Sequence, residues 1–212
     1  MLTTTEENYL KAIFSISERS HKSASTNDLA KQLETSAASV TDMLKRLAQK
    51  ELINYIKYKG VTLTTEGIKN ATQLLRKHRL WEVFLVEKLR FSWDQVHDIA
   101  EHLEHIQSNE LIMRLDAFLN YPKFDPHGDP IPNADGKFTI RNQTPLSYMH
   151  ESQKGVLVGV KSHKTDFLLY LNKLNIKLGT EIEVVATNSY DNLFDIKIDG
   201  KNKITITATI AQ

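Results

Sequence analysis

The sequence predicts a mainly α-helical chain that begins with a winged helix-turn-helix and ends with a small β-barrel. Two helical patterns separated by a three-residue break, and then two β-prone runs around a Lys/Gly turn, occupy residues 26–63. A predominantly helical segment covers residues 66–120. Beyond a proline-rich stretch, several short β-prone segments separated by turns are typical of a small barrel.

Length and composition limit the possible classes of protein. The 212 residues have room for one large domain or two to three small ones, and we divide them into domains 1–72, 73–143 and 144–212. A hydrophobic content of 41% and a charged content of 25% are those of an ordinary soluble protein. We recognise no signal peptide and no membrane-spanning apolar run, which predicts a cytoplasmic protein without a membrane partner. The absence of cysteine excludes disulfide frameworks, thiolate zinc sites and cysteine nucleophiles.

Capping residues and apolar spacing predict the N-terminal elements. Residues 6–17 have apolar side chains at helical spacing, and residues 25–28 offer an N-cap to a short second helix. Thr35 or Ser36 can cap a third helix, which would enter the major groove of DNA in such a fold. The core stripe of this third helix is Val40, Met43, Leu44 and Leu47. Residues 52–63 form the predicted hairpin wing.

The charge distribution agrees with a nucleic-acid-binding N-terminal part. Residues 1–79 contain 13 Lys and Arg against 8 Asp and Glu, whereas the remaining residues contain 14 against 18. A basic N-terminal third followed by an acidic remainder favours a module that faces nucleic acid.

The helical middle of the chain carries a candidate metal site. A helix from Glu66 to about Leu89, capped by Thr64 or Thr65, places a histidine and a glutamate in its apolar seam, where each is costly to bury without a partner. The next helix starts at residues 92–94, and four of its side chains at i, i+4, i+7 and i+8 share one face. These four are His97, Glu101, Glu104 and His105. Carboxylates and neutral imidazoles suit a borderline divalent cation. A solvated helix face is the alternative interpretation.

Short elements fill the rest of the chain. Another helix is predicted over residues 109–119, and the proline-rich residues 121–143 are linker-like. The predicted strands are 155–160, 181–186, 193–198 and 204–210, with a short helix at 167–174.

With these pieces in order, the chain resembles the diphtheria toxin repressor family, including its manganese-transport-regulator branch, over essentially its whole length. Four segments carry the resemblance: residues 4–10 (TTEENYL), 76–82 (RKHRLWE), 96–105 (VHDIAEHLEH) and 126–132 (PHGDPIP). The resemblance implies a homodimeric repressor, not an enzyme, that is activated by Fe²⁺ or Mn²⁺ and binds palindromic double-stranded operator DNA near metal-uptake genes. It also implies a winged helix-turn-helix, a helical dimerisation and metal-binding domain, and a C-terminal Src-homology-like (FeoA-like) β-barrel.

The resemblance also implies two sets of metal ligands. By motif position, Glu101, Glu104 and His105 belong to the primary activating site, and the N-terminal helix contributes Asn8. Iron-selective relatives have Met at the Asn8 position and manganese-selective relatives have Asp. For the second site, the iron-type set is His78, Glu82 and His97. The manganese-type set is Glu82 with a Cys-Pro-His motif that here reads Asp125-Pro126-His127, and both sets remain open.

Other positions depart from the relatives. Lys11 stands where the smallest manganese regulators have a Glu ligand, which argues against their two-metal arrangement. In a gapless alignment, the barrel residues that close the second site fall on Lys164 and Phe167, which cannot serve. His163 or Asp166 could substitute after a local shift.

By the same resemblance, bases or nearby phosphates would be contacted by Ser36, Ala38, Ser39 and Asp42. The candidates for sequence-independent phosphate contact are Arg46, Lys50, Lys57 and Lys59. The oxygen and nitrogen ligands favour Mn²⁺, with Fe²⁺ as the second choice. The rival function is a metal-independent winged-helix regulator with a structural or vestigial metal site.

Overall fold

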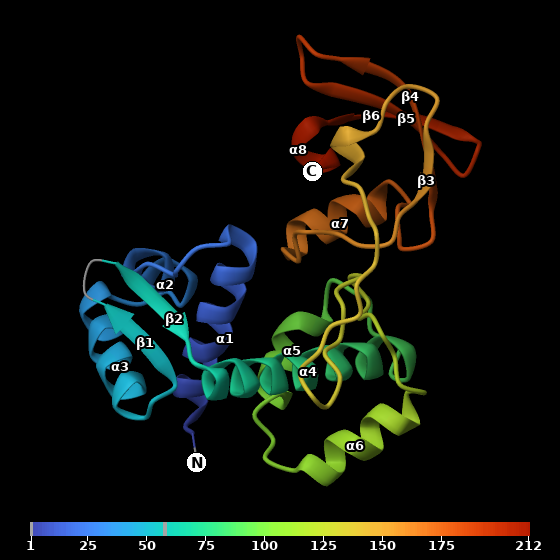
Figure 1. The fold of residues 1–212 in the computed structure, drawn as a ribbon. Helices are drawn as coiled ribbons and strands as arrows, with labels where there is room; N and C mark the ends of the chain where they lie inside the picture. The colour runs from blue at the N-terminus through green and yellow to red at the C-terminus, as the bar shows by residue number, and fades with distance from the viewer. Residues whose placement is uncertain (1, 57–58) are drawn as a thin grey trace. The chain divides into compact units, whose positions relative to one another are not determined.

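The computed structural model describes residues 2–56 and 59–212, and the chain forms two compact units (Figure 1). The first unit comprises Met1–Trp81, Glu101–Arg114 and Ile131–Phe138. The second unit comprises Glu82–Ala100, Leu115–Pro130 and Thr139–Gln212. No helix among the described residues is both long enough and apolar enough to cross a membrane.

The first unit contains the predicted winged helix-turn-helix (Figure 1). Its helices are α1 (Thr4–Ser20), α2 (Thr26–Gln32) and α3 (Ala37–Gln49). The wing is the antiparallel hairpin of β1 (Ile53–Ile56) and β2 (Gly60–Leu63). The predicted elements are confirmed, and α1 extends three residues beyond its predicted end at residue 17.

Hydroxyl side chains set the starts of these helices. Thr3 and Glu6 form a capping box at α1, in which each side chain bonds the other residue's backbone N–H. Ser25 caps α2 and Ser36 caps α3, so Ser36 rather than Thr35 is the residue that begins the third helix. One apolar core lies beneath the three helices and the wing. Its buried side chains include Leu10, Ile13, Leu29, Val40, Leu44, Leu47, Leu52 and Val61.

The middle of the chain forms α4 (Thr65–Glu87), α5 (Val96–Leu103) and α6 (Asn109–Phe118). Thr64 caps α4 by accepting the backbone N–H of Gly67. The prediction that a single helical face carries His97 through His105 is wrong, because α5 ends at Leu103. The backbone N–H of Ile106 bonds the carbonyl of Leu103, so Glu104 and His105 lie in a turn.

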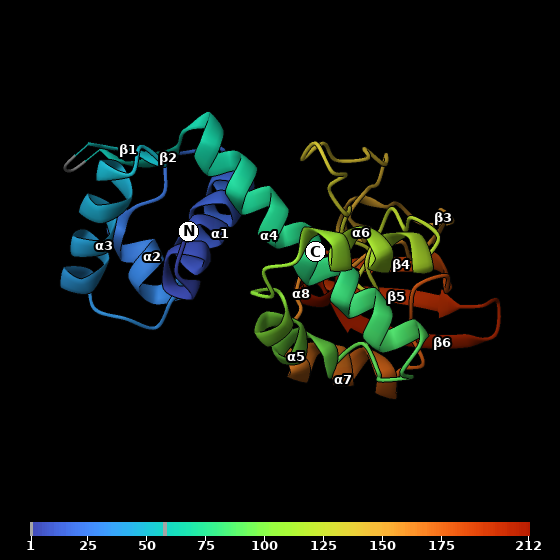
Figure 2. The same ribbon diagram turned by 90° about the horizontal axis from the view of Figure 1, so that it is seen from below.

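The C-terminal part of the second unit is an antiparallel sheet with a helix packed on it (Figure 2). The elements are η1 (Leu146–Tyr148), β3 (Lys154–Val156), α7 (Thr165–Lys173), β4 (Glu181–Asn188), β5 (Leu193–Ile198), β6 (Asn202–Thr207) and α8 (Ala208–Ala211). The strand order is β3-β4-β5-β6, with Ile182 opposite Ile198 in the register of β4 and β5. Leu168 and Leu171 of α7 are buried with the sheet's isoleucines.

Three predictions for this part differ from the structure. The strand predicted over 155–160 ends at Val156, because the following backbone bonds elsewhere: the N–H of Val160 donates to the carbonyl of His127. The strand predicted over 204–210 ends at Thr207, where α8 begins. The predicted barrel is not confirmed, since the four strands form an open sheet with β3 and β6 at its edges.

The proline-rich residues 121–143 contain no helix or longer strand, but they are held in place. In the first unit, Arg76 and Gln73 of α4 donate to the carbonyls of Pro132 and Ala134. In the second unit, Gly128 has φ +90°, and a Cβ there would lie 2.1 Å from the carbonyl oxygen of Val158. Only glycine allows this backbone-to-backbone approach, which sets the position of the adjacent His127.

We predict that Gly128→Ala destabilises the protein more than Gly179→Ala. Both glycines have a left-handed backbone, with φ of +90° and +89°, but nothing lies within 4 Å of a Cβ added at Gly179. The two variants therefore share the conformational cost, and only Gly128→Ala adds a clash with the backbone. The difference in unfolding free energy should be about 1–3 kcal/mol, measured by urea denaturation. Equal losses would contradict the close packing described here.

Candidate metal centre

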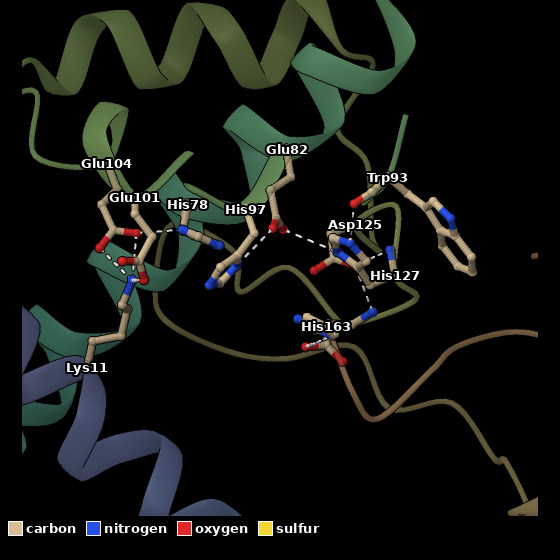
Figure 3. Close-up of polar contacts among 11 residues, drawn as sticks. Lys11, His78, Glu82, Trp93, His97, Glu101, Glu104, Asp125, His127 and His163 are labelled. Carbon is tan, nitrogen blue, oxygen red and sulfur yellow. Dashed lines mark hydrogen bonds and ion pairs between the residues drawn. The ribbon is translucent and has the colours of Figure 1, made fainter. Parts of the chain in front are cut away.

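In the first unit, one face of α1 meets the segment that follows α5. Glu7, Asn8 and Lys11 share that face, because they lie three and four residues apart. The ammonium nitrogen of Lys11 lies 3.0 Å from Oε1 of Glu101, and 2.6 and 2.8 Å from the two carboxylate oxygens of Glu104 (Figure 3). We call Lys11, His78, Glu101 and Glu104 the first cluster.

Glu104 is the centre of this cluster. Its side chain is 0% exposed, and its Oε2 lies 2.6 Å from Nδ1 of His78 on α4. A carboxylate taken out of water is stable only when it is paired and hydrogen-bonded. Lys11 and His78 together meet this requirement.

His105 is oriented by a residue that the sequence analysis did not single out. Its Nδ1 lies 2.6 Å from a carboxylate oxygen of Glu7, and Gln107 donates to the other oxygen of the same carboxylate. Its Nε2 lies 3.7 Å from Oε1 of Glu104. A carboxylate bonded to one ring nitrogen directs the other nitrogen as a metal ligand. Glu7 is thus a positioning residue for His105.

The side-chain oxygen of Asn8 is a buried hydrogen-bond acceptor. No group among the described residues donates a hydrogen bond to this Oδ1. A buried carbonyl oxygen left in this state is costly, and a cation is one partner that would satisfy it.

The donor atoms fit a divalent cation. His78, Glu101 and Glu104 each offer a ligand atom, and these atoms lie within 4.8 Å of one another. The four predicted primary ligands Asn8, Glu101, Glu104 and His105 all belong to the first unit. Their oxygen and nitrogen donors suit a hard or borderline ion.

The second unit contains a second cluster, formed by Glu82, Asp125 and His127 (Figure 3). All three are buried, with exposed fractions of 1%, 4% and 0%. Nδ1 of His127 lies 3.7 Å from Oε2 of Glu82 and 4.0 Å from Oδ1 of Asp125. These residues form the manganese-type set of the sequence analysis.

Hydrogen bonds to backbone groups fix the orientation of the side chains in this cluster. Nε2 of His127 donates to the backbone carbonyl of Trp93 at 2.8 Å, so Nδ1 faces the two carboxylates. Oδ1 of Asp125 accepts the backbone N–H groups of His127 and Asp129. Although burial opposes protonation, the hydrogen bond and charge of Glu82 and the charge of Asp125 raise the pKa of His127.

His97 and His163 lie beside the second cluster. Nδ1 of His97 is 3.5 Å from Oε1 of Glu82, and the ring of His163 stacks on that of His127 at 4.4 Å. Both residues line a cleft of about 320 Å³. Of the two barrel substitutes considered from sequence, His163 is the one that lies here. The iron-type set divides between the units, because His78 belongs to the first and Glu82 and His97 to the second.

The third helix with its two caps, and the wing, carry the residues expected to face DNA. All seven of the described candidates are exposed, whereas Val40, Leu44 and Leu47 on the other face of α3 are buried. The seven are Ser36, Ala38, Ser39, Asp42, Arg46, Lys50 and Lys59. Nζ of Lys50 lies 2.6 Å from Oε1 of Glu6. The eighth candidate, Lys57, lies outside the described residues.

Three consecutive regions of the chain match known protein families. Residues 1–61 match the iron dependent repressor N-terminal DNA binding domain, residues 64–133 the iron dependent repressor metal binding and dimerisation domain, and residues 144–212 the FeoA domain.

Two solved structures and one curated protein illustrate the similarity. A manganese-dependent transcriptional repressor in complex with manganese is 33% identical, with a TM-score of 0.88 over 98% of this chain and 96% of that chain. The manganese regulator SloR is 35% identical, with a TM-score of 0.77 over 97% and 94%. The iron-dependent repressor IdeR of Mycobacterium leprae is 34% identical over 131 residues, which are 62% of this chain and 56% of that protein.

The structure predicts acid sensitivity from His163. Burial, and then the charge of His127, lower the pKa of His163 from its ordinary 6.5 to about 4. The unfolded chain therefore takes up a proton as the pH falls below 6.5, whereas the folded protein does so only near pH 4. The contribution of His163 to the unfolding free energy should fall by up to about 3 kcal/mol across this window, with no further loss from this residue below it.

Urea denaturation from pH 7 to 4 in chelator, with His163→Gln as the variant, measures this contribution. The variant should lose less stability than the parent on acidification. The exposed His150→Gln serves as the control and should follow the parent. Parallel curves for the parent and His163→Gln would contradict the prediction.

Proposed function

Because the chain belongs to the diphtheria toxin repressor family of metal-dependent transcriptional repressors, we propose that Mn²⁺ activates it to bind palindromic operator DNA as a homodimer and to control metal-uptake genes. Proteins of this family are not enzymes. The observation that carries the proposal is the first cluster. Ligand atoms of His78 on α4, Glu101 on α5 and Glu104 in the turn after α5 lie within 4.8 Å of one another there, and Lys11 of α1 contacts both carboxylates.

We assign the primary site to Asn8, Glu101, Glu104 and His105, with His78 as a further nitrogen donor and Glu7 holding His105. Mn²⁺ is favoured over Fe²⁺ because this donor set is hard and contains no sulfur. The similarity to manganese-dependent repressors over nearly the whole chain supports the same choice. Mn²⁺ binds such sites more weakly than Fe²⁺ or Zn²⁺, so selectivity would come from geometry and cellular supply.

For the second site we favour the manganese-type set Glu82, Asp125 and His127. Their burial, and the orientation of Nδ1 of His127 toward two carboxylates, support this assignment. His163 is a candidate for completing the site. The iron-type set of His78, Glu82 and His97 remains the alternative.

A cation at the primary site would act as an electrostatic link. Asn8 belongs to the first helix of the winged helix-turn-helix, whereas Glu101, Glu104 and His105 belong to the region that matches the metal binding and dimerisation domain. Joining them would fix the spacing of the two recognition helices in a dimer. Half-sites of a palindrome lie ~34–36 Å apart, so this spacing determines whether both helices fit. Coupling of this kind is typically worth about 1–3 kcal/mol.

The division into domains 1–72, 73–143 and 144–212 is part of the proposal. Three matched regions in the same order support a three-part chain, although their bounds differ from ours by several residues.

The second candidate function is metal-independent regulation by the same DNA-binding domain. One observation favours it: the ammonium group of Lys11 already contacts the carboxylates of Glu101 and Glu104. In that case the first cluster would be a permanent ion-pair network rather than a sensor.

The deciding experiment is fluorescence anisotropy of the chelator-stripped protein on the promoter fragments of its own gene and of the nearest metal-transporter gene. Mn²⁺, anaerobic Fe²⁺ and Zn²⁺ are titrated at fixed ionic strength, with a scrambled duplex as control. Specific binding that requires metal supports the proposal, and the most effective ion identifies the cofactor. Specific binding without metal supports the second candidate.

We predict that Glu101→Gln loses metal-stimulated DNA binding but keeps its fold. The side chain of Glu101 is 46% exposed, so its replacement disturbs the core less than replacement of Glu104. Mn²⁺ binding should weaken by roughly 10- to 100-fold. Glu18→Gln, an exposed acid on α1, is the matched control. An unchanged metal response in Glu101→Gln would refute the site assignment.

We predict that Arg46→Gln weakens DNA binding to a similar extent on operator and scrambled duplexes. Arg46 is exposed on the DNA-facing side of α3, and a phosphate contact carries no sequence information. The slope of log affinity against log salt should decrease by about 1. Ser39→Ala, on the same face but nearer the start of α3, should instead alter the preference among operator variants. Loss of operator binding alone in Arg46→Gln would assign it to base reading.

A further inference from the structure

We propose that Lys11 is a built-in cation that competes with the activating metal ion for Glu101 and Glu104, and so sets the metal concentration at which the protein responds. This inference rests on the proposed primary metal site. It assigns a regulatory role to a residue that cannot itself be a ligand while its amine is protonated.

The first support is the position of the ammonium group. Nζ of Lys11 lies within 3.0 Å of three carboxylate oxygens, one from Glu101 and two from Glu104 (Figure 3). The Lys11 side chain is only 15% exposed, unlike that of a solvated surface lysine. A compact charge on an unbranched stem is suited to entering and leaving such a position.

The second support is the charge balance at Glu104. This carboxylate is fully buried, and its partners in the first cluster are the ammonium group of Lys11 and Nδ1 of His78. Without a cation, a buried carboxylate is strongly destabilising. In the metal-free protein, Lys11 thus neutralises the charge that a bound metal ion would otherwise neutralise. Asn8 is uncharged, so unlike an aspartate it adds no negative charge that would strengthen metal binding.

The third support is that the two cations use the same atoms. A divalent ion coordinating Glu101 and Glu104 would take the oxygens that now accept from Lys11. An ammonium kept on those oxygens would lie within a few ångströms of a doubly charged ion, where repulsion is large. Loading must therefore move Lys11 away, and the metal affinity is reduced by whatever the Lys11 contacts contribute.

The arrangement on α1 couples this exchange to the DNA-binding domain. Lys11 lies one turn after Asn8 on the same helix face, so the residue to be displaced and the proposed ligand belong to one element. Replacing Lys11 by an ion would exchange one link between α1 and the 101–104 segment for another. Metal-free protein would keep a weaker form of the same link.

The test compares Lys11→Leu with the parent by Mn²⁺ titration, with electron paramagnetic resonance reporting the free aqueous ion. Leucine retains bulk and offers no charge or ligand. We expect the apparent Kd of one ion per chain to fall by about 10- to 100-fold. Lys22→Leu, which removes an exposed lysine just beyond α1, should bind like the parent.

A second readout separates competition from a general effect on folding. In chelator, Lys11→Leu should unfold at lower urea than the parent, and saturating Mn²⁺ should raise its midpoint by more than it raises that of the parent. If Lys11→Leu does not fold without metal, Lys11→Gln keeps a hydrogen-bond donor to Glu104 and should also bind Mn²⁺ more tightly than the parent. Parent-like or weaker Mn²⁺ affinity in the folded Lys11 variant would overturn the proposal.

The outcomes also distinguish this inference from the proposed function. If the parent binds Mn²⁺ and the Lys11 variants bind it no more tightly, the metal site stands and the competition is overturned. If the variants bind Mn²⁺ but the parent does not, the competition is supported and the metal-dependent function of the parent fails. If neither binds the ion, both ideas are overturned.

Discussion

The buried negative charge of Glu104 is the constraint on which the first unit depends. A carboxylate with no exposed surface must have cationic or hydrogen-bonding partners in every direction, and these come from two helices that are distant in sequence. Lys11 on α1 and His78 on α4 both contact its carboxylate oxygens. α5 ends at Leu103, and Glu104 in the following turn contacts both partners. Polar contacts thus join α1 to the segment after α5: Lys11 with Glu104, and Glu7 with His105.

The second cluster shows a different way of holding buried carboxylates. Here the backbone does much of the positioning: Asp125 accepts two N–H groups, and the carbonyl of Trp93 fixes the tautomer of His127. Gly128 lets the loop lie directly on the chain that follows β3, which carries His163 into ring contact with His127. Such a cluster is preorganised by main-chain geometry, whereas the first cluster is held mainly by flexible side chains. The two sites consequently differ in how much rearrangement an ion would require.

Local signals made much of the fold predictable from sequence. The helix starts at Ser25, Ser36 and Thr64 follow from their hydroxyl groups, and the stripe on α3 follows from apolar spacing. What escaped prediction depends on distant partners. The early end of β3 reflects backbone bonds to the loop at His127, and the turn after α5 places Glu104 against a lysine more than ninety positions earlier.

The roles of Glu7 and Lys11 could not be predicted from the sequence, because they too depend on partners that are distant in the chain. Both look like ordinary charged residues of an amphipathic helix, and only the folded chain brings them to His105 and Glu104. Their spacing with Asn8 on one helix face was the available signal. The second cluster was easier, because Asp125 and His127 stand in a recognisable motif and Glu82 interrupts an apolar seam.

The ion pair between Glu6 and Lys50 bears on how strongly the protein binds DNA of unrelated sequence. Glu6 serves the capping box of α1 and at the same time holds the ammonium group of Lys50 at the end of α3. Its pKa is lowered despite burial, because Lys50 and Thr3 stabilise the carboxylate. Non-specific DNA binding is driven by the release of counterions when lysines and arginines contact phosphates. A lysine that is already paired with a carboxylate is less available for such a contact. While this ion pair holds, Lys50 would add less to sequence-independent binding, and fewer molecules would be held at non-specific genomic sites.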